Sequence, residues 1–257
     1  MKLYCVQLDT VWENKRANFS RVEALLHSAA PGRGSLVLLP EMFATGFSMD
    51  VARVREGRER ETEQFLAATA KKLGIYLMGG LVTAAPRGKG RNQAVIYTPG
   101  GNELARYTKL QPFTPGGESR NYQAGQSITL CKWGGFNLAP FICYDLRFPE
   151  HFRAATRRGA QLITVIASWP VRRIGHWVTL LQARAIENQA YVAGVNRSGT
   201  DPQLTYNGRS LIISPRGEIL ADAGNSESII SANLELNELL ACRKELPFLK
   251  DMRSPVR

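Results

Sequence analysis

The sequence of 257 residues contains no apolar run approaching the roughly 18–20 residues that a membrane-spanning helix needs. The N-terminal residues also lack the apolar core of a secretory signal, because Asp9 interrupts them. Cysteine is scarce and never spaced as C-x-x-C, and the four cysteines are Cys5, Cys131, Cys143 and Cys242. We therefore expect a cytoplasmic protein with reduced thiols and no membrane partner.

Histidine is equally scarce, with only His27, His151 and His176, and neither histidines nor cysteines show the spacing of metal ligands. The glycine-rich patterns that hold nucleotide phosphates, G-x-x-x-x-G-K-[ST] and G-x-G-x-x-G, are absent. No linker, internal repeat or low-complexity tract divides the chain. We expect one domain over residues 1–257, with no metal and no cofactor.

Acidic residues are too few to balance the basic ones, and the formal net charge is +11. Such an excess raises nucleic acid as a partner. Between Arg53 and Arg60, however, the arginines alternate with Glu56 and Glu59, and no basic stripe carries stacking aromatics. We therefore expect no nucleic-acid partner. A non-enzymatic polyanion-binding protein remains an alternative, for which binding would be salt-sensitive and independent of Cys143.

The hydrophobic pattern predicts an α/β fold. Continuous apolar runs typical of strands buried on both faces lie at residues 35–39, 75–82, 136–142 and 161–167, and helical periodicity lies at residues 14–29, 61–73 and 175–188. The order strand–helix–strand–helix–strand with an appended hairpin occurs twice. This order predicts two packed sheets with helices outside both, a four-layer α-β-β-α sandwich. Residues 108–126 are expected to form a long ordered loop.

The segment from Phe136 to Glu150 places a cysteine at the end of one of these strands. Cys143 follows the apolar run directly, and Pro149 then marks the start of a helical pattern. A nucleophile at a strand-to-helix turn has a rigid support and nearby amide N–H groups that can stabilise negative charge. A cysteine beside an apolar strand is more often a small buried hydrophobe, so the segment needs reactive partners.

Glu41 and Lys109 are the expected partners of Cys143. Alone, each is typical of a solvated loop charge. Together the three side chains supply what thiol hydrolysis of an amide requires, because a free cysteine with a pKa of about 8.5 needs a base. A cation must also stabilise the tetrahedral oxyanion. Glu41 and Cys143 each end a buried strand in their own half of the chain, which favours a meeting at one edge.

Three strings carry a resemblance to a known family: P-E-M-F-x-T-G-F-S-M from Pro40, Y-x-K ending at Lys109, and I-C-Y-D-L-R-F-P-E from Ile142. They resemble the nitrilase (carbon–nitrogen hydrolase) superfamily, over about residues 2–248, and most of all its bacterial omega-amidases. The resemblance implies the four-layer fold, a homodimer or larger homo-oligomer, and chemistry without a cofactor. The implied substrates are the terminal amides of 2-oxoglutaramate and 2-oxosuccinamate.

The resemblance also implies roles for individual residues. Glu41 would be the general base and Cys143 the nucleophile, which forms a thioester as ammonia leaves. Lys109 and the backbone N–H of Tyr144 would stabilise the tetrahedral intermediate. Glu118 matches a second glutamate that orients the lysine and the substrate in many members, although a solvated loop carboxylate would also suit its position.

Three further residues are candidates for substrate binding. Arg147 could bind the carboxylate of an oxo acid, or instead form a salt bridge with Asp145 or Glu150. Trp169 and Phe47 could form walls of the pocket, although aromatic side chains at strand ends are often core residues.

Two alternatives to this chemistry remain open. The chain could be another amidase of the superfamily, acting on a short aliphatic amide or an N-carbamoyl compound. It could also be a Cys–His hydrolase that uses His151, although a histidine at such a position is more often a helix-surface residue. In addition, Gln111 stands where relatives commonly have histidine, as in K-x-H-P-F, and we expect this difference to alter pH dependence or substrate fit.

Overall fold

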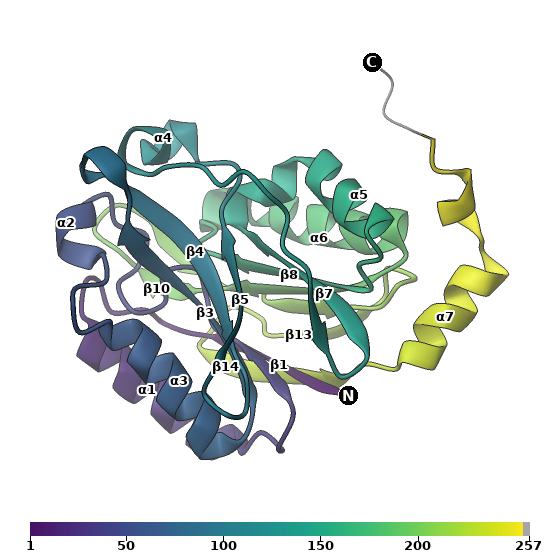
Figure 1. The fold of residues 1–257 in the computed structure, drawn as a ribbon, viewed down its shortest axis with the longest axis horizontal. Helices are drawn as coiled ribbons and strands as arrows, with labels where there is room; N and C mark the ends of the chain where they lie inside the picture. The colour runs from purple at the N-terminus through teal and green to yellow at the C-terminus, as the bar shows by residue number, and fades with distance from the viewer. Residues whose placement is uncertain (254–257) are drawn as a thin grey trace.

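The computed structural model describes residues 1–253, and its centre is formed by two six-stranded sheets that pack face to face (Figure 1). The first sheet has the order β14-β1-β2-β3-β4-β5, with β1 (Lys2–Gln7), β2 (Leu36–Leu38), β3 (Tyr76–Ala84), β4 (Gly90–Tyr97), β5 (Glu103–Thr108) and β14 (Ser228–Asn233). The second has the order β13-β12-β9-β8-β7-β6, with β6 (Cys131–Trp133), β7 (Phe136–Ile142), β8 (Leu162–Ala167), β9 (Tyr191–Asn196), β12 (Leu211–Ile213) and β13 (Ile219–Asp222).

Helices cover the outer face of each sheet, as the sequence predicts. The long helices are α1 (Lys15–Ala29) and α3 (Glu61–Leu73) on the first sheet, and α5 (Pro149–Arg157) and α6 (Ile174–Asn188) on the second. Shorter elements are α2 (Val51–Val54), α4 (Glu118–Asn121), α7 (Leu236–Glu245), the β10 (Ser198–Thr200)–β11 (Thr205–Asn207) hairpin and several 3-10 turns. The predicted four-layer α-β-β-α sandwich is confirmed.

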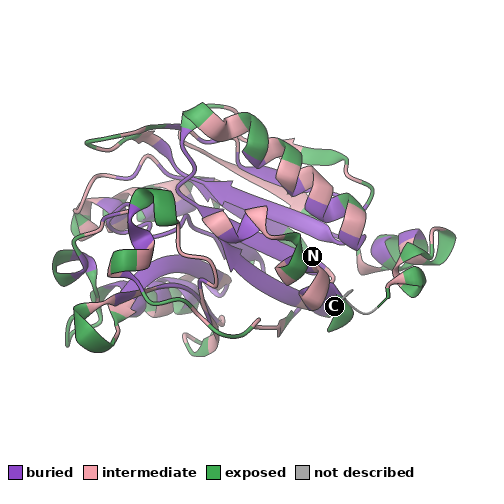
Figure 2. Cartoon of the chain, turned by 90° about the horizontal axis from the view of Figure 1, so that it is seen from above, coloured by how far each residue is buried: buried purple, intermediate pink, exposed green. Residues whose placement is uncertain are grey.

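Side chains on the two faces of the first sheet pack into two different hydrophobic cores. Leu3 and Cys5 of β1 belong to the core between the sheets, whereas Tyr4 and Val6 pack in the core formed with α1 and α3. This division follows from the strand period of two, which sends successive side chains to opposite faces. Figure 2 shows buried strands in the middle and exposed residues on the outer surfaces of the helices and in loops.

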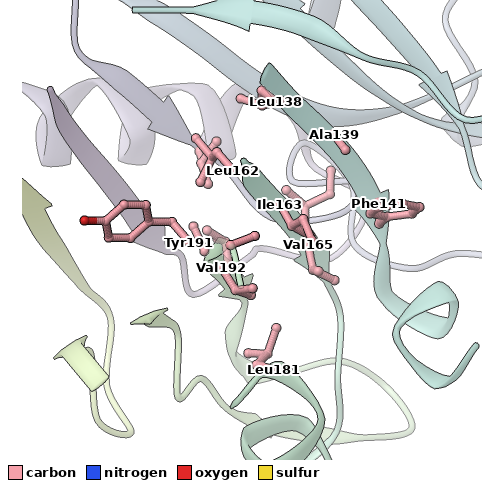
Figure 3. Packing of buried hydrophobic residues seen from close by; sticks show 14 of the residues in the cluster. Leu138, Ala139, Phe141, Leu162, Ile163, Val165, Leu181, Tyr191 and Val192 are labelled. Atoms are coloured by element: carbon pink, nitrogen blue, oxygen red, sulfur yellow. The ribbon is translucent and has the colours of Figure 1, made fainter. Parts of the chain in front are cut away.

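The central strands of the second sheet are buried on both faces. Every residue of β8 is buried, and Figure 3 shows Ile163 and Val165 of that strand in the cluster that includes Leu181 of α6. The parallel neighbours β7, β8 and β9 alternate with α5 and α6 along the chain, so helices cover one face and the first sheet covers the other. Continuous apolar runs are typical of such strands.

Several short elements were not predicted. The expected loop over residues 108–126 contains a 3-10 turn, η2 (Thr114–Gly116), and α4. The strands β6, β10 and β11 and the helix α2 have only three or four residues each, too few for a recognisable period. The closing strand β14 returns to pair with β1 and therefore belongs to the first sheet.

Among the helices of the described residues, none combines the length and apolar character that crossing a membrane requires. The predicted single domain extends to Arg257, and its last four residues, 254–257, lie outside the described residues.

Candidate active site

Three strand ends bring the predicted site residues together. Glu41 follows β2, Lys109 follows β5 directly, and Cys143 follows β7 directly. The Lys109 Nζ lies 2.9 Å from Glu41 Oε1, although the two residues are 68 positions apart in the sequence. The expectation that these strand ends meet at one edge therefore agrees with the structure.

Glu118 lies on the other side of Lys109. Its Oε2 is 2.8 Å from Lys109 Nζ and accepts a further hydrogen bond from the Phe113 amide at 2.5 Å. The side chain is fully buried, so the alternative of a solvated loop carboxylate is wrong. Burial by itself would lower the pKa of Lys109. The charges of Glu118 and Glu41 together have the larger and opposite effect, so the pKa of Lys109 is well above its usual value. Lys109 is therefore a fixed cation between two carboxylates.

Asn92 of β4 completes this cluster and was missed from the sequence. Its Nδ2 donates to Glu41 Oε1 at 2.7 Å and to Glu118 Oε1 at 2.9 Å, and the residue is buried. The sequence gives no signal for it, because Asn92 stands between Arg91 and Gln93 in the polar half of β4, and only its burial shows that it requires a hydrogen-bonding partner.

The backbone around Glu41 approaches the first sheet at Gly80 of β3. A Cβ at this glycine would lie 2.4 Å from the Met42 nitrogen and 2.7 Å from the Glu41 Cα. Only glycine leaves room for this approach. On the opposite side, the backbone N–H of Ser168, directly after β8, donates to Glu41 Oε2 at 2.9 Å.

Cys143 has a left-handed backbone conformation, with φ of 46°, at the start of the 3-10 turn η3 (Cys143–Arg147). For a residue other than glycine, this conformation costs about 1–3 kcal/mol and is typical of functional sites. Burial, followed by the Glu41 carboxylate, raises the pKa of the thiol well above its usual value, while Lys109 and the Ser168 N–H act in the opposite direction. This environment therefore favours the neutral thiol over the thiolate.

Cys143 opens into a pocket with about 390 Å³ of empty space, part of it open to solvent. The predicted substrate-binding residues Phe47, Arg147 and Trp169 all line it. Other lining residues were not predicted and come from short or irregular segments: Phe113, Ser168, Pro170, Arg173, Leu204 and Tyr206.

Arg147 has none of the salt bridges that were considered for it. Its guanidinium lies 4.8 Å from the Trp169 ring centroid, and Nη2 lies 3.2 Å from His176 Nδ1. Asp145 instead accepts hydrogen bonds from Tyr107 and from backbone amides. Within residues 1–253, no ion pair joins Arg147 to a carboxylate, so the salt-bridge alternative is wrong for this structure.

The histidines take other positions. His151 Nε2 lies 3.2 Å from Gln111 Nε2, and the ring is partly buried rather than on an open helix surface. The charged groups with the largest effect on the pKa of the Cys143 thiol are Glu41, Lys109 and Glu118 rather than a histidine. This arrangement does not favour the Cys–His alternative. No group of three His, Cys, Asp or Glu side chains suited to a metal ion occurs in the described part of the chain.

Known proteins resemble this chain over nearly its whole length. The sequence model of the family described as Carbon-nitrogen hydrolase matches residues 2–244. The omega-amidase YafV of Yersinia enterocolitica is 37% identical over 255 residues, which cover 98% of this chain and 96% of the relative. The 2-oxoglutaramate amidase of Bacillus subtilis (strain 168) is 32% identical over 250 residues, which cover 97% and 96%.

Solved structures show the same similarity. The crystal structure of XC1258 from Xanthomonas campestris, a CN-hydrolase superfamily protein with an arsenic adduct in its active site, has a TM-score of 0.92 and 32% sequence identity. The matched region covers 100% of this chain and 98% of that one.

Proposed function

The chain belongs to the carbon–nitrogen hydrolase family and is an enzyme that hydrolyses amides, and we propose that it is an omega-amidase. Its substrates would be small 2-oxo dicarboxylic acid monoamides, such as 2-oxoglutaramate and 2-oxosuccinamate. The names of the similar omega-amidases support this choice.

The observation that carries the proposal is a pair of arginines in the pocket of Cys143. Arg147 and Arg173 both line it, and within the described residues neither forms an ion pair with a carboxylate. Burial, followed by the charge of Arg173, lowers the pKa of Arg147. A substrate carboxylate would relieve this repulsion and would accept charge-assisted hydrogen bonds. The amide at the other end of the substrate would then face the thiol.

In the proposed reaction, Cys143 Sγ attacks the amide carbonyl carbon while Glu41 accepts the thiol proton. Lys109 Nζ and the backbone N–H of Tyr144, in the first turn of η3, stabilise the oxyanion. Glu41 then protonates the leaving nitrogen, the carbon–nitrogen bond breaks, and ammonia departs from a thioester. Glu41 next takes a proton from water, and the water oxygen attacks the thioester carbonyl carbon. The carbon–sulfur bond then breaks, Glu41 returns the proton to the Cys143 sulfur, and the carboxylic acid product leaves.

The resting state of the site is consistent with this sequence. Because this environment favours the neutral thiol, attack requires a base within reach. Glu41 is the carboxylate with the largest effect on the pKa of the thiol. Lys109 would remain charged throughout, which suits a group that stabilises an oxyanion. The second carboxylate, Glu118, would orient Lys109.

The test is ammonia release from 2-oxoglutaramate, compared with glutamine, a short aliphatic amide and an N-carbamoyl amino acid. We expect turnover of the oxo-acid amide, no turnover after Cys143→Ala, and a thioester adduct detected by intact mass in the wild type. Faster turnover of the aliphatic amide or the N-carbamoyl compound would identify a different amidase of the family. Unchanged activity after Cys143→Ala would contradict the assigned nucleophile.

Cytoplasmic location, homodimerisation and the absence of a nucleic-acid partner remain predictions. Light scattering across a concentration series would test the dimer. Binding of a labelled oligonucleotide at low salt would test the last prediction, because the excess of basic residues would act most strongly there.

A further inference from the structure

Among the described residues, Asn92 is the one uncharged side chain that bridges both carboxylates of the site, through the two hydrogens of its Nδ2. We propose that Asn92 is a positioning residue that directs the thiol proton to Oε2 of Glu41. This inference rests on the proposed role of Glu41 as the general base.

The orientation of the amide follows from its neighbours. Turning it over would place Oδ1 against two carboxylates, so the Nδ2 group must be the one that faces them. In this orientation Oδ1 is buried and has no hydrogen-bond partner within the described residues. A buried acceptor without a partner costs free energy, and such groups in native proteins call for a functional explanation. The fold accepts this cost and places both N–H groups on the carboxylates.

The sheet itself does not need this side chain. The backbone of Asn92 is paired in β4, opposite Val82 of β3, and its carbonyl accepts from the Lys109 amide at 2.9 Å. The strand would keep these bonds with another residue at the position. The contacts that are specific to asparagine are therefore the two to Glu41 and Glu118.

The two oxygens of Glu41 have different surroundings, and Asn92 increases the difference. Oε1 accepts from both Lys109 Nζ and Asn92 Nδ2, whereas within residues 1–253 Oε2 accepts only from the Ser168 amide. Ser168 and Cys143 line the same pocket. Oε2 is therefore the oxygen that is bonded to a residue of the Cys143 pocket, and it accepts one hydrogen bond fewer than Oε1.

An uncharged donor is the group that suits this position. Glu41, Glu118 and Lys109 carry a formal net charge of −1, which attracts a proton to the cluster. A second cation in place of Asn92 would neutralise the cluster and weaken the base. A carboxylate in place of Asn92 would bring three negative groups together. It would favour protonation of the cluster before Glu41 could accept the thiol proton.

The experiment replaces Asn92 by aspartate, which has the same shape but no N–H group. Alkylation of Cys143 by iodoacetamide, followed by mass spectrometry of its peptide, reports thiol activation without any substrate. For Asn92→Asp we expect kcat to fall by about 100-fold or more, with KM changed by less than about threefold. The rise of kcat and of the alkylation rate on the acidic side of their pH profiles should both shift to higher pH by about one unit.

Gln93→Glu is the matched control, because it makes the same amide-to-carboxylate change at the next residue of β4. The Gln93 side chain bonds to Thr83, Arg106 and Thr108, outside the carboxylate cluster. We expect this variant to keep the wild-type pH profiles. Asn92→Ser, which adds no charge, should lower kcat by about tenfold and serves if the aspartate variant does not fold.

Glu41→Gln, measured in parallel, separates this inference from the proposed function. If Glu41→Gln changes the alkylation profile and Asn92→Asp does not, the role of Asn92 is overturned while the base assignment stands. If neither variant changes it, both are overturned. A serine variant with kcat within about threefold of the wild type would also overturn the proposal, because loss of both bridges would then have no effect on the base.

Discussion

The hydroxyl of Tyr107 donates a buried hydrogen bond of 2.7 Å to Asp145 Oδ2, and this bond joins the two halves of the site. Tyr107 lies on β5, two residues before Lys109, and Asp145 lies in η3, two residues after Cys143. The same carboxylate oxygen accepts from the Ile142 amide at 2.9 Å. The distance between Lys109 and Cys143 therefore depends on a hydrogen bond between two other residues, Tyr107 and Asp145.

Tyr107→Phe tests this connection. The change leaves Asp145 without one of its donors and the Leu110 amide without its acceptor, so we expect a loss of about 1–3 kcal/mol in the free energy of unfolding. Activity should fall more than stability alone explains, with kcat down by about tenfold at temperatures where the variant is fully folded. Chemical denaturation and steady-state kinetics are the measurements.

Tyr97→Phe is the control for this change, because Tyr97 is also a buried tyrosine of the first sheet. Its hydroxyl makes no hydrogen bond within the described residues. We expect kcat near that of the wild type, and a loss equal to that of Tyr107→Phe would contradict the special role of the Tyr107 contact.

Asp145 gives a pH dependence with a defined sign. Burial raises its pKa from 3.8 to about 6, against the opposing effects of Lys109 and of its hydrogen bonds. Between these two values the folded protein binds a proton that the unfolded chain has lost. The contribution of Asp145 to stability is therefore complete below about pH 4 and is lost as the pH rises through about 6.

The measurement is the free energy of unfolding of the wild type minus that of Asp145→Asn, taken from pH 4 to pH 7. We expect this difference to fall by up to about 3 kcal/mol over the range, because each pKa unit corresponds to about 1.4 kcal/mol. A difference that is constant with pH, or that rises, would show that Asp145 does not titrate in this way.

Gly80→Ala tests the close approach of the Glu41 backbone to β3. The added methyl would overlap the Met42 nitrogen and the Glu41 Cα, and backbone atoms cannot turn away as a side chain can. We expect a loss of about 1–3 kcal/mol in stability and a fall in kcat of tenfold or more, because Glu41 must move.

Gly79→Ala is the control, since its methyl would meet the Leu66 and Phe43 side chains on the other face. That variant should lose stability but keep kcat, and equal kcat losses would contradict the argument.

The layers of the fold and the central residues of the site were accessible from the sequence. Long apolar runs identify strands that are covered on both faces, and each of Glu41, Lys109 and Cys143 stands within three residues of the end of such a strand or of a strand in the same sheet. The family resemblance, confirmed over residues 2–244, adds Glu118. These features depend on local pattern and on the ends of long elements.

The remaining parts of the site depend on contacts that no local pattern records. Asn92 reaches Glu41 across 51 positions of sequence, and Ser168 reaches it across 127. The left-handed conformation of Cys143 could not be expected, because residues other than glycine rarely adopt it. Pocket residues such as Arg173 come from short turns, whose paths are determined by packing against distant segments.

Removal of the pocket arginines tests the origin of substrate charge preference. Arg147→Ala and Arg173→Ala each remove a cation that would bind the substrate carboxylate, and a charge-assisted hydrogen bond contributes about 1.5–3 kcal/mol. We therefore expect KM for 2-oxoglutaramate to rise by about 10-fold to 150-fold, with a smaller change in kcat. A neutral aliphatic amide of similar length should be hydrolysed as by the wild type, because it has no carboxylate to lose.

Arg172→Ala is the matched control, since Arg172 is exposed and stands next to Arg173 without lining the pocket. It lowers the net charge by the same amount, so any effect of long-range attraction would appear in it as well and would weaken with added salt. Selective loss on the charged substrate in the two pocket variants, with none in Arg172→Ala, would locate carboxylate binding at Arg147 and Arg173. Equal losses on the charged and neutral amides would instead mean that these arginines support the shape of the pocket, and the preference for an anionic substrate would need another source.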